Sequence, residues 1–174
     1  MKKFGYITIA AIAVLAASLM VAPTAHAASV CVDEVTAGGW VPDGGADQFA
    51  NFGLNARQET RGEATTLTGN LNFVDADMDC HVVSTNVISY TVTNEVCREI
   101  VYDVTLSLSD VLQEGEFIAV VDVCDFGEPS TSDTFSISVY DVTVPTTPVL
   151  VETCSASGTV SGGNVQIHHY GNCP

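Results

Sequence analysis

The chain has few basic residues. Lys and Arg together number 5 among 174 residues, whereas Asp and Glu number 21, and the net charge is −16 at pH 7. Proteins that bind DNA, RNA or anionic membrane surfaces use clusters of Lys and Arg to replace the counterions of the phosphates. The composition therefore argues against a nucleic-acid partner and against electrostatic attachment to a membrane.

The sequence also lacks a helical repeat of apolar residues. Apolar and polar residues instead alternate in short segments, most clearly over residues 52–56, 67–73, 100–108, 117–123 and 135–139. Such alternation is typical of strands that bury one face, and Gly, Asn, Asp and Pro mark the turns between them. We predict one all-β domain, an antiparallel two-sheet sandwich of roughly eight to ten strands.

Only one long apolar run occurs, Ile7 to Ala22. Lys2 and Lys3 precede it, and the small-x-small sequence Ala25-His26-Ala27 follows it. This order is that of a secretion signal, so we predict a signal peptide at residues 1–27 and a β-sandwich domain at residues 28–174. Removal of the signal leaves three arginines against all 21 carboxylates, a net charge of −18.

The rival reading of the apolar run is an uncleaved membrane anchor, because the run is a little shorter than the roughly 20 residues that span a bilayer. No second run of this length follows it. We therefore expect no transmembrane segment after signal removal. We predict an exported protein that is extracellular or periplasmic.

Zinc-binding cysteine motifs are absent, since no Cys-x-x-Cys pair occurs. The chain nevertheless has six cysteines, all after the predicted signal, and an even number in an exported chain indicates disulfides. The six are Cys31, Cys80, Cys97, Cys124, Cys154 and Cys173.

One disulfide follows from strand register. Residues 96–108 and 116–124 alternate with matching parity, which predicts an antiparallel hairpin. When Cys97 lies opposite Cys124, the apolar faces of both strands coincide, so we predict this disulfide. Cys31 and Cys173 lie at the two ends of the mature chain, and chain termini are often close together. That leaves Cys31–Cys173 and Cys80–Cys154 as the expected remaining pairs.

Three segments carry a family resemblance. They are Val35-Thr36-Ala37-Gly38-Gly39-Trp40-Val41-Pro42, then Asp125-Phe126-Gly127-Glu128-Pro129 with Asp133-Thr134-Phe135, and finally Ser161-Gly162-Gly163-Asn164-Val165-Gln166-Ile167-His168. Together they resemble a group of uncharacterised bacterial extracellular β-domains with a Gly-Gly-Trp opening, an Asp-x-Gly-Glu-Pro turn and a closing Ser-Gly-Gly-Asn-Ile/Val-Gln-Ile-His strand. The likeness spans about residues 33 to 169.

The chain departs from that group at three positions. Phe126 stands where the group has Asn, Ser130 where it has Gly, and Ala37 lies in the opening segment. The resemblance implies a secreted or surface β-module, and it implies no established activity.

The acidic turns are the candidate metal sites, because carboxylates clustered in loops bind calcium through oxygen ligands. Asp75, Asp77 and Asp79 imitate the first ligands of a calcium loop. The sixth position is Cys80 instead of Gly, and the twelfth is Asn86 instead of Glu, so the segment is not an EF-hand.

In the second acidic turn, Asp125, Glu128 and Asp133 are predicted to converge on one ion. The alternative for both turns is that the carboxylates are solvated and only start turns. We expect no required cofactor, with calcium as the candidate ion.

Aromatic and histidine side chains are further candidate binding groups. Trp40 is a candidate sugar-stacking residue, whereas Tyr90 and Tyr102 fall on apolar strand parity and are expected inside. Ile88 and Val92 share the parity of Tyr90 and are expected to face the core with it. We expect His168 to be hydrogen-bonded within the sandwich.

We therefore expect a secreted or cell-surface β-module that has a binding or structural role and no catalytic activity. Calcium is the candidate ion that would stabilise it. Its partner would be an unknown protein or glycan. The alternative is a small secreted hydrolase that uses a pair of Asp or Glu carboxylates. A further alternative is that the acidity reflects adaptation to high salt.

Overall fold

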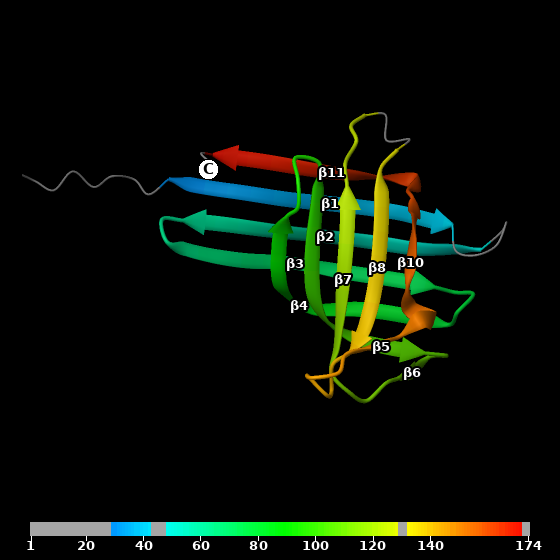
Figure 1. The fold of residues 1–174 in the computed structure, drawn as a ribbon. Helices are drawn as coiled ribbons and strands as arrows, with labels where there is room; N and C mark the ends of the chain where they lie inside the picture. The colour runs from blue at the N-terminus through cyan, green and yellow to red at the C-terminus, as the bar shows by residue number, and fades with distance from the viewer. Residues whose placement is uncertain (1–28, 43–47, 129–131, 172–174) are drawn as a thin grey trace, which may run out of the picture.

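The computed structural model describes residues 29–42, 48–128 and 132–171. These residues form an all-β, antiparallel structure, as predicted (Figure 1). The predicted signal, residues 1–27, lies outside the described residues. The elements are β1 Val30–Pro42, β2 Phe49–Arg61, β3 Ala64–Asp75, β4 Cys80–Val92, β5 Cys97–Leu108, β6 Val111–Leu112, β7 Phe117–Cys124, β8 Thr134–Asp141, β9 Val149–Leu150, the 3-10 helix η1 Glu152–Cys154, β10 Ala156–Thr159 and β11 Ser161–Gly171.

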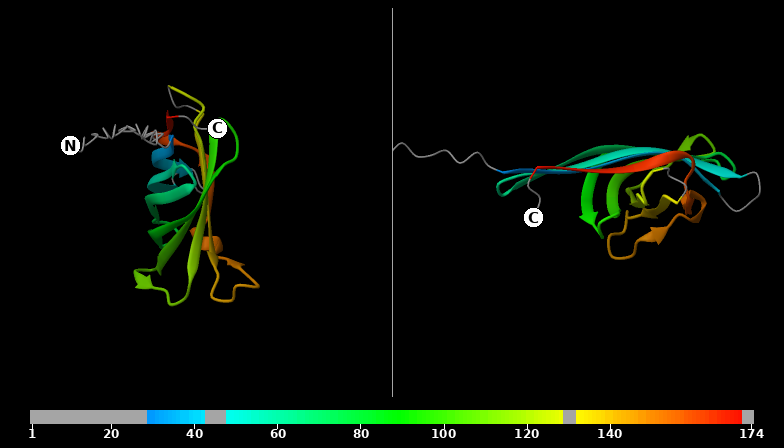
Figure 2. Two further views of the ribbon diagram at one scale, coloured as in Figure 1. Left: turned by 90° about the vertical axis from the view of Figure 1, so that its left-hand side faces the viewer. Right: turned by 90° about the horizontal axis from the view of Figure 1, so that it is seen from above.

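All strands belong to one hydrogen-bonded sheet with the order β10-β8-β7-β5-β4-β3-β2-β1-β11. The short strand β6 pairs with β5, and β9 pairs with β8. The sheet curls over itself. In Figure 1, β11, β1, β2 and β3 run across the molecule while β5, β7 and β8 cross them steeply. Figure 2 shows the second group against only one face of the first. The two layers of the sandwich are therefore two halves of one curled sheet whose strands cross.

Strand β4 makes the passage from one layer to the other. It pairs with β3 only over residues 80–83, and then follows β5 with two register shifts, between Ser84 and Asn86 and between Val87 and Ser89. Each β-bulge adds one unpaired residue and bends the strand.

The two bulges also change which side chains face the core. The expectation for Ile88 and Val92 is wrong, because they are 46% and 51% exposed, whereas Val87 and Tyr90 are buried. Ile88 is the residue that the second bulge leaves unpaired, which the alternation in the sequence does not reveal, whereas Val92 keeps the parity of Tyr90 and is exposed at the last position of β4.

Aromatic rings from both layers meet in the core. Phe52 of β2 stacks on Phe135 of β8 with ring centroids 3.8 Å apart, and Phe73 of β3 lies 6.4 Å from Phe135. The Tyr102 side chain is buried as predicted, and its hydroxyl donates to the Asn55 carbonyl oxygen at 3.0 Å. The sandwich is thus held by apolar contacts between layers whose strands cross.

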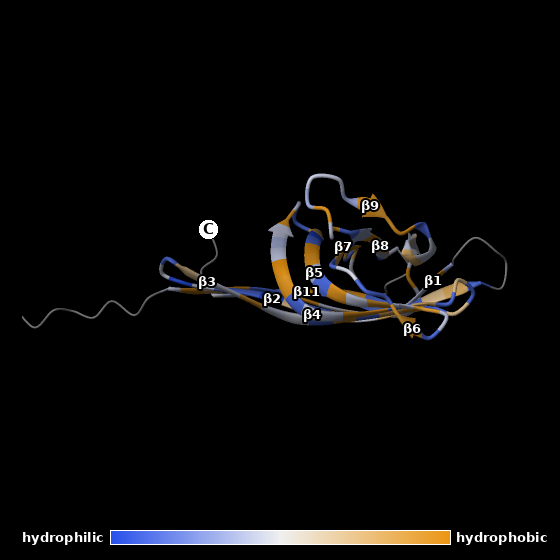
Figure 3. Ribbon diagram, turned by 90° about the horizontal axis from the view of Figure 1, so that it is seen from below, coloured by the Kyte–Doolittle hydropathy of each residue, from blue (hydrophilic) through white to orange (hydrophobic). Residues whose placement is uncertain are grey.

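Some of the exposed apolar residues lie on the two shortest strands. Val111, Leu112, Val149 and Leu150 of the short strands β6 and β9 are exposed (Figure 3). Two-residue strands offer little backbone for pairing with another chain, so they blunt this edge of the sheet. Within the described ranges, no helix is long and apolar enough to span a membrane.

Two predicted disulfides are confirmed. Cys97 lies opposite Cys124 in the β5–β7 ladder and is bonded to it, and Cys80 of β4 is bonded to Cys154 of η1. Cys173 lies outside the described residues, so its pairing with Cys31 stays a prediction.

We expect the Cys80–Cys154 disulfide to contribute more to stability than Cys97–Cys124. It spans 74 residues instead of 27, and the loop-closure entropy is worth about 4.5 kcal/mol against about 3.5 kcal/mol. Urea unfolding of the two double alanine variants, one for each disulfide, measures the difference. Equal losses, or a larger loss for the Cys97/Cys124 variant, would contradict this ranking.

Candidate functional site

A buried ion pair joins the two layers. Arg98 of β5 is fully buried and Asp33 of β1 is 5% exposed. The Arg98 Nε and Nη2 atoms donate to the two carboxylate oxygens of Asp33, each at 2.8 Å. Arg98 Nη1 donates to the carbonyl oxygens of Asn94 and Cys97, both at 2.8 Å. Each of the three guanidinium nitrogens of Arg98 therefore donates to at least one oxygen of the protein.

Two further side chains complete this cluster. The Tyr90 hydroxyl of β4 donates to Asp33 Oδ1, and His169 Nδ1 of β11 lies 2.8 Å from Asp33 Oδ2. His169 Nε2 lies 3.0 Å from Arg98 Nη2. The expectation that His168 is hydrogen-bonded within the sandwich is corrected, because His168 is half-buried and its ring centroid lies 6.0 Å from that of Tyr170. His169 reaches the ion pair instead, because residues 165, 167 and 169 share the inner side of β11.

The ion pair fixes the charge state of its members. Burial of Asp33 opposes ionisation, but hydrogen bonds from Arg98 and Tyr90 and the positive charge of Arg98 outweigh it and lower the pKa of Asp33. Burial, reinforced by the Asp33 carboxylate, raises the pKa of Tyr90. The cluster is therefore a locked ionic contact and holds no carboxylic acid that could donate a proton at neutral pH.

The second acidic turn holds the free edge of β11. Asp133 is fully buried. Its Oδ1 accepts the Phe126 N–H and its Oδ2 accepts the Val165 N–H, each at 2.9 Å. Asp125 Oδ2 accepts the Ile167 N–H at 3.0 Å. Two carboxylates thus cap backbone donors that an edge strand otherwise leaves unpaired.

The third predicted ligand of this turn also contacts β11, since Glu128 Oε1 accepts from Asn164 Nδ2 at 2.6 Å. The three carboxylates therefore lie along one strand, each engaged by a different residue. In the part of the chain that the structure describes, no three His, Cys, Asp or Glu side chains are grouped to hold a metal ion. Calcium binding here stays a prediction.

The glycines of the opening and closing segments allow β1 and β11 to approach closely. A Cβ on Gly163 would lie 1.9 Å from the Gly38 carbonyl oxygen, and a Cβ on Gly162, where φ is +60°, would lie 2.4 Å from Trp40 Nε1. Together with the Asp125 and Asp133 contacts described above, these contacts bring all three resembling segments to one junction around β11.

The first acidic turn is stabilised by its own carboxylate. Asp75 is 1% exposed, and its Oδ1 accepts the N–H groups of Asp77 and Met78 at 3.0 and 3.1 Å. Asp79 has a φ of +50° and its carbonyl accepts the Ser109 N–H at 2.9 Å. Asp77 and Asp79 are exposed. Asp75 Oδ1 therefore closes an Asx turn, while its buried Oδ2 has no hydrogen-bond partner among the described residues.

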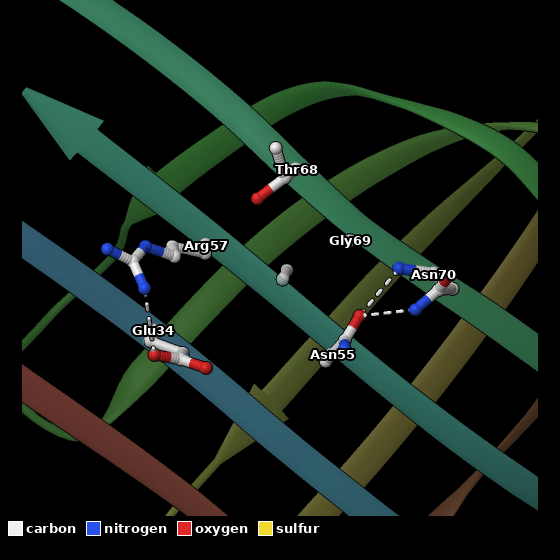
Figure 4. A pocket seen from close by; sticks show the side chains of 7 residues that line it. Glu34, Asn55, Arg57, Thr68, Gly69 and Asn70 are labelled. Atoms are coloured by element: carbon white, nitrogen blue, oxygen red, sulfur yellow. Dashed lines mark hydrogen bonds and ion pairs between the residues drawn. The ribbon is translucent and has the colours of Figure 1, made fainter.

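The outer face of the first layer carries a shallow hollow of about 320 Å³ (Figure 4). Asn55 Oδ1 accepts from the Asn70 backbone N at 2.7 Å and from Asn70 Nδ2 at 2.8 Å, and Arg57 Nη1 lies 3.9 Å from Glu34 Oε2. Arg57 Nη2 also donates to Glu59 Oε2 at 2.6 Å, so the hollow is lined by uncharged amides together with Glu34 and a doubly paired Arg57.

Comparisons with known protein families, curated proteins and solved structures found no match to this chain. The resemblance to uncharacterised extracellular β-domains stays an expectation. Function must be argued from the geometry of the described residues.

We expect the stability that Asp33 provides to depend on pH. Its pKa is lowered from 3.8 in the folded protein, so the stabilisation is complete above 3.8 and is lost as the pH falls through the folded-state pKa. Asp33→Asn should cost about 3–5 kcal/mol near neutral pH, because it leaves the Arg98 charge unpaired. The difference between wild type and variant in urea unfolding should shrink as the pH falls below 3.8. A difference that stays constant over this range would contradict the assignment.

We expect Asp133→Asn to destabilise the protein by about 1–3 kcal/mol, because an amide nitrogen cannot accept one of the two backbone N–H groups. The matched control is Asp77→Asn in the exposed turn, which should change stability by less than about 0.5 kcal/mol. Thermal unfolding measures both variants. Equal midpoints for Asp133→Asn and wild type would contradict the structural role of Asp133.

Thermal unfolding of the wild type in EDTA and in calcium, with sodium chloride at matched ionic strength, tests the calcium prediction.

Proposed function

We propose that this chain is an exported, non-catalytic β-module that serves as a binding or structural domain outside the cytoplasm. The observation that carries the proposal is the use of the buried carboxylates. Asp33, Asp75 and Asp133 are the buried acidic residues of the described ranges, and each accepts hydrogen bonds from the protein. These groups hold strands and turns in place.

The pKa pattern supports the same proposal. A hydrolase with two carboxylates needs one that stays protonated, which requires a raised pKa. Hydrogen bonds or charges lower the pKa of the Asp33, Glu59 and Asp141 carboxyl groups. Hydrolysis by a carboxylate pair remains the competing proposal.

Export is supported by the disulfides. Such bonds persist in the periplasm and outside the cell, whereas cytosolic thiols are kept reduced. The two described bridges and the buried ion pair make a rigid scaffold, and a rigid scaffold presents its surface to a partner with little loss of conformational entropy on binding. The partner would be a protein or a glycan.

Expression of the full chain in a bacterium with a general secretory pathway tests the proposal. We expect the protein outside the cytoplasm, with Ala28 as its first residue by N-terminal sequencing. The purified product should not hydrolyse chromogenic glycosides, esters or peptides above the level of a heat-denatured sample.

Two results would contradict the proposal. Retention of the uncleaved chain in the cytoplasm would remove export. Turnover that Glu128→Gln abolishes, while Asp77→Asn preserves it, would support the hydrolase and locate its carboxylate.

A further inference from the structure

The outer face of the first layer has the properties of a binding surface. It is the side of β11, β1, β2 and β3 that is turned away from the second layer (Figure 2). Every second residue of these strands points to this side, and the strand registers align them into cross-strand rows. Two adjacent rows consist of Gln166, Thr36, Asn55 and Asn70, and of Asn164, Gly38, Gly53 and Asn72.

These two rows, which we call the amide face, contain no charged residue of their own, while Glu128 contacts Asn164 at the β11 end and Glu34 and Arg57 lie in the neighbouring row. The chain as a whole has 21 acidic residues and a net charge of −16. Five of the eight positions carry a side-chain amide, a group that donates and accepts hydrogen bonds at the same time. A surface that only kept the protein soluble would not need to exclude carboxylates from its centre.

The amide face is hollowed. Three hollows of about 320, 400 and 250 Å³ lie across the strands, and neighbouring hollows share Asn55, Asn70 or Leu54 in their linings. Gly38 and Gly53 lie side by side in the ladder and form part of the floor. A Cβ on Gly53 would meet nothing within 4 Å, so the missing side chain leaves open space.

Several polar atoms of the amide face are held in place and remain available. Asn55 Oδ1 is occupied by Asn70, and Asn72 Oδ1 lies 2.8 Å from His81 Nε2. Among the described residues, this leaves Asn55 Nδ2 and Asn72 Nδ2 as donors and Asn70 Oδ1 as an acceptor for a ligand. Their positions are fixed before binding, which lowers the entropic cost of association.

An aromatic pair borders the amide face. Trp40 follows Gly38 on the same side of β1, and its ring centroid lies 4.3 Å from that of Phe49. Phe49 is 37% exposed. Aromatic rings next to hydrogen-bonding amides suit a ligand that has both apolar C–H faces and hydroxyl groups.

Resting on the proposed function of a non-catalytic module, we propose that the amide face binds a neutral polysaccharide whose chain lies across strands β11, β1, β2 and β3. Sugar hydroxyls match the amide donors and acceptors, and a sugar ring can stack at Trp40. An acidic polymer would be repelled by the net charge. A protein partner is disfavoured, since the amide face offers no buried aromatic or Arg anchor at its centre.

Depletion assays with insoluble polysaccharides test the proposal. The mature, oxidised protein is mixed with cellulose, β-1,3-glucan, chitin or starch granules as neutral polymers, and with insoluble pectate as the acidic polymer. We expect depletion by at least one neutral polymer and none by pectate. Gly53→Val should weaken this binding by at least about tenfold by filling the hollow.

The folding of the variant is checked independently. Valine is favoured in strands and meets open space at this position, so the Gly53→Val midpoint of thermal unfolding should equal or exceed that of wild type. The matched control is Ser138→Val on β8, which lines a separate hollow in the second layer. It should bind like wild type.

Three results would overturn the inference: no depletion by any of the four neutral polymers, equal depletion by pectate, or unchanged binding by Gly53→Val. None of these alters the export or turnover results, so the proposed function would stand without its glycan ligand. Conversely, cytoplasmic retention or turnover in those earlier assays would leave the depletion result unaffected.

Discussion

The contact between Arg98 and Asp33 determines how the curled sheet closes. A single sheet that folds over itself needs a fixed point at which its two layers meet, because apolar packing alone tolerates small displacements of one layer against the other. The bidentate pair joins β5 to β1 with directional bonds, and Tyr90 and His169 add contacts from β4 and β11. A one-residue slip of β5 would turn the guanidinium to the opposite face. The buried charges therefore select the register, even where they add little net stability.

The same requirement explains the acidic turn between β7 and β8. Strand β11 is an end of the sheet and pairs only with β1. Asp125 and Asp133 bring the second layer to its open edge and occupy its backbone donors. In a chain with 21 acidic and only 5 basic residues, carboxylates outnumber the cationic side chains, and backbone N–H groups are partners available to them. Asp125 and Asp133, which were predicted as metal ligands, consequently accept backbone N–H groups in the fold.

Strand alternation predicted the all-β class, the β5–β7 register and the Cys97–Cys124 disulfide, because these depend on local parity and on residues that face each other in one ladder. The Cys80–Cys154 disulfide was predicted only as the pair that remained once the two terminal cysteines had been paired. The bulges of β4 were missed because the extra residues leave no clear sequence signal. The ion pair was also missed, although charged residues on apolar parity, Asp33 before Val35 and Arg98 before Ile100, are a signal that could have found it. The amide face depends on cross-strand neighbours from β11, β1, β2 and β3, and a linear sequence does not place these together.

The distribution of charge gives the amide face its significance. Carboxylates on an acidic chain keep its copies apart and repel polyanions, so a proposed ligand of the uncharged amide face needs contacts other than electrostatic attraction. Hydrogen bonds from fixed amides to hydroxyls, together with stacking on an aromatic ring, supply affinity that changes little with salt. A rigid, neutral hollow on an acidic module thus favours a neutral, hydroxyl-rich ligand over a charged one, and the missing side chain of Gly53 gives that ligand the room to approach the strands.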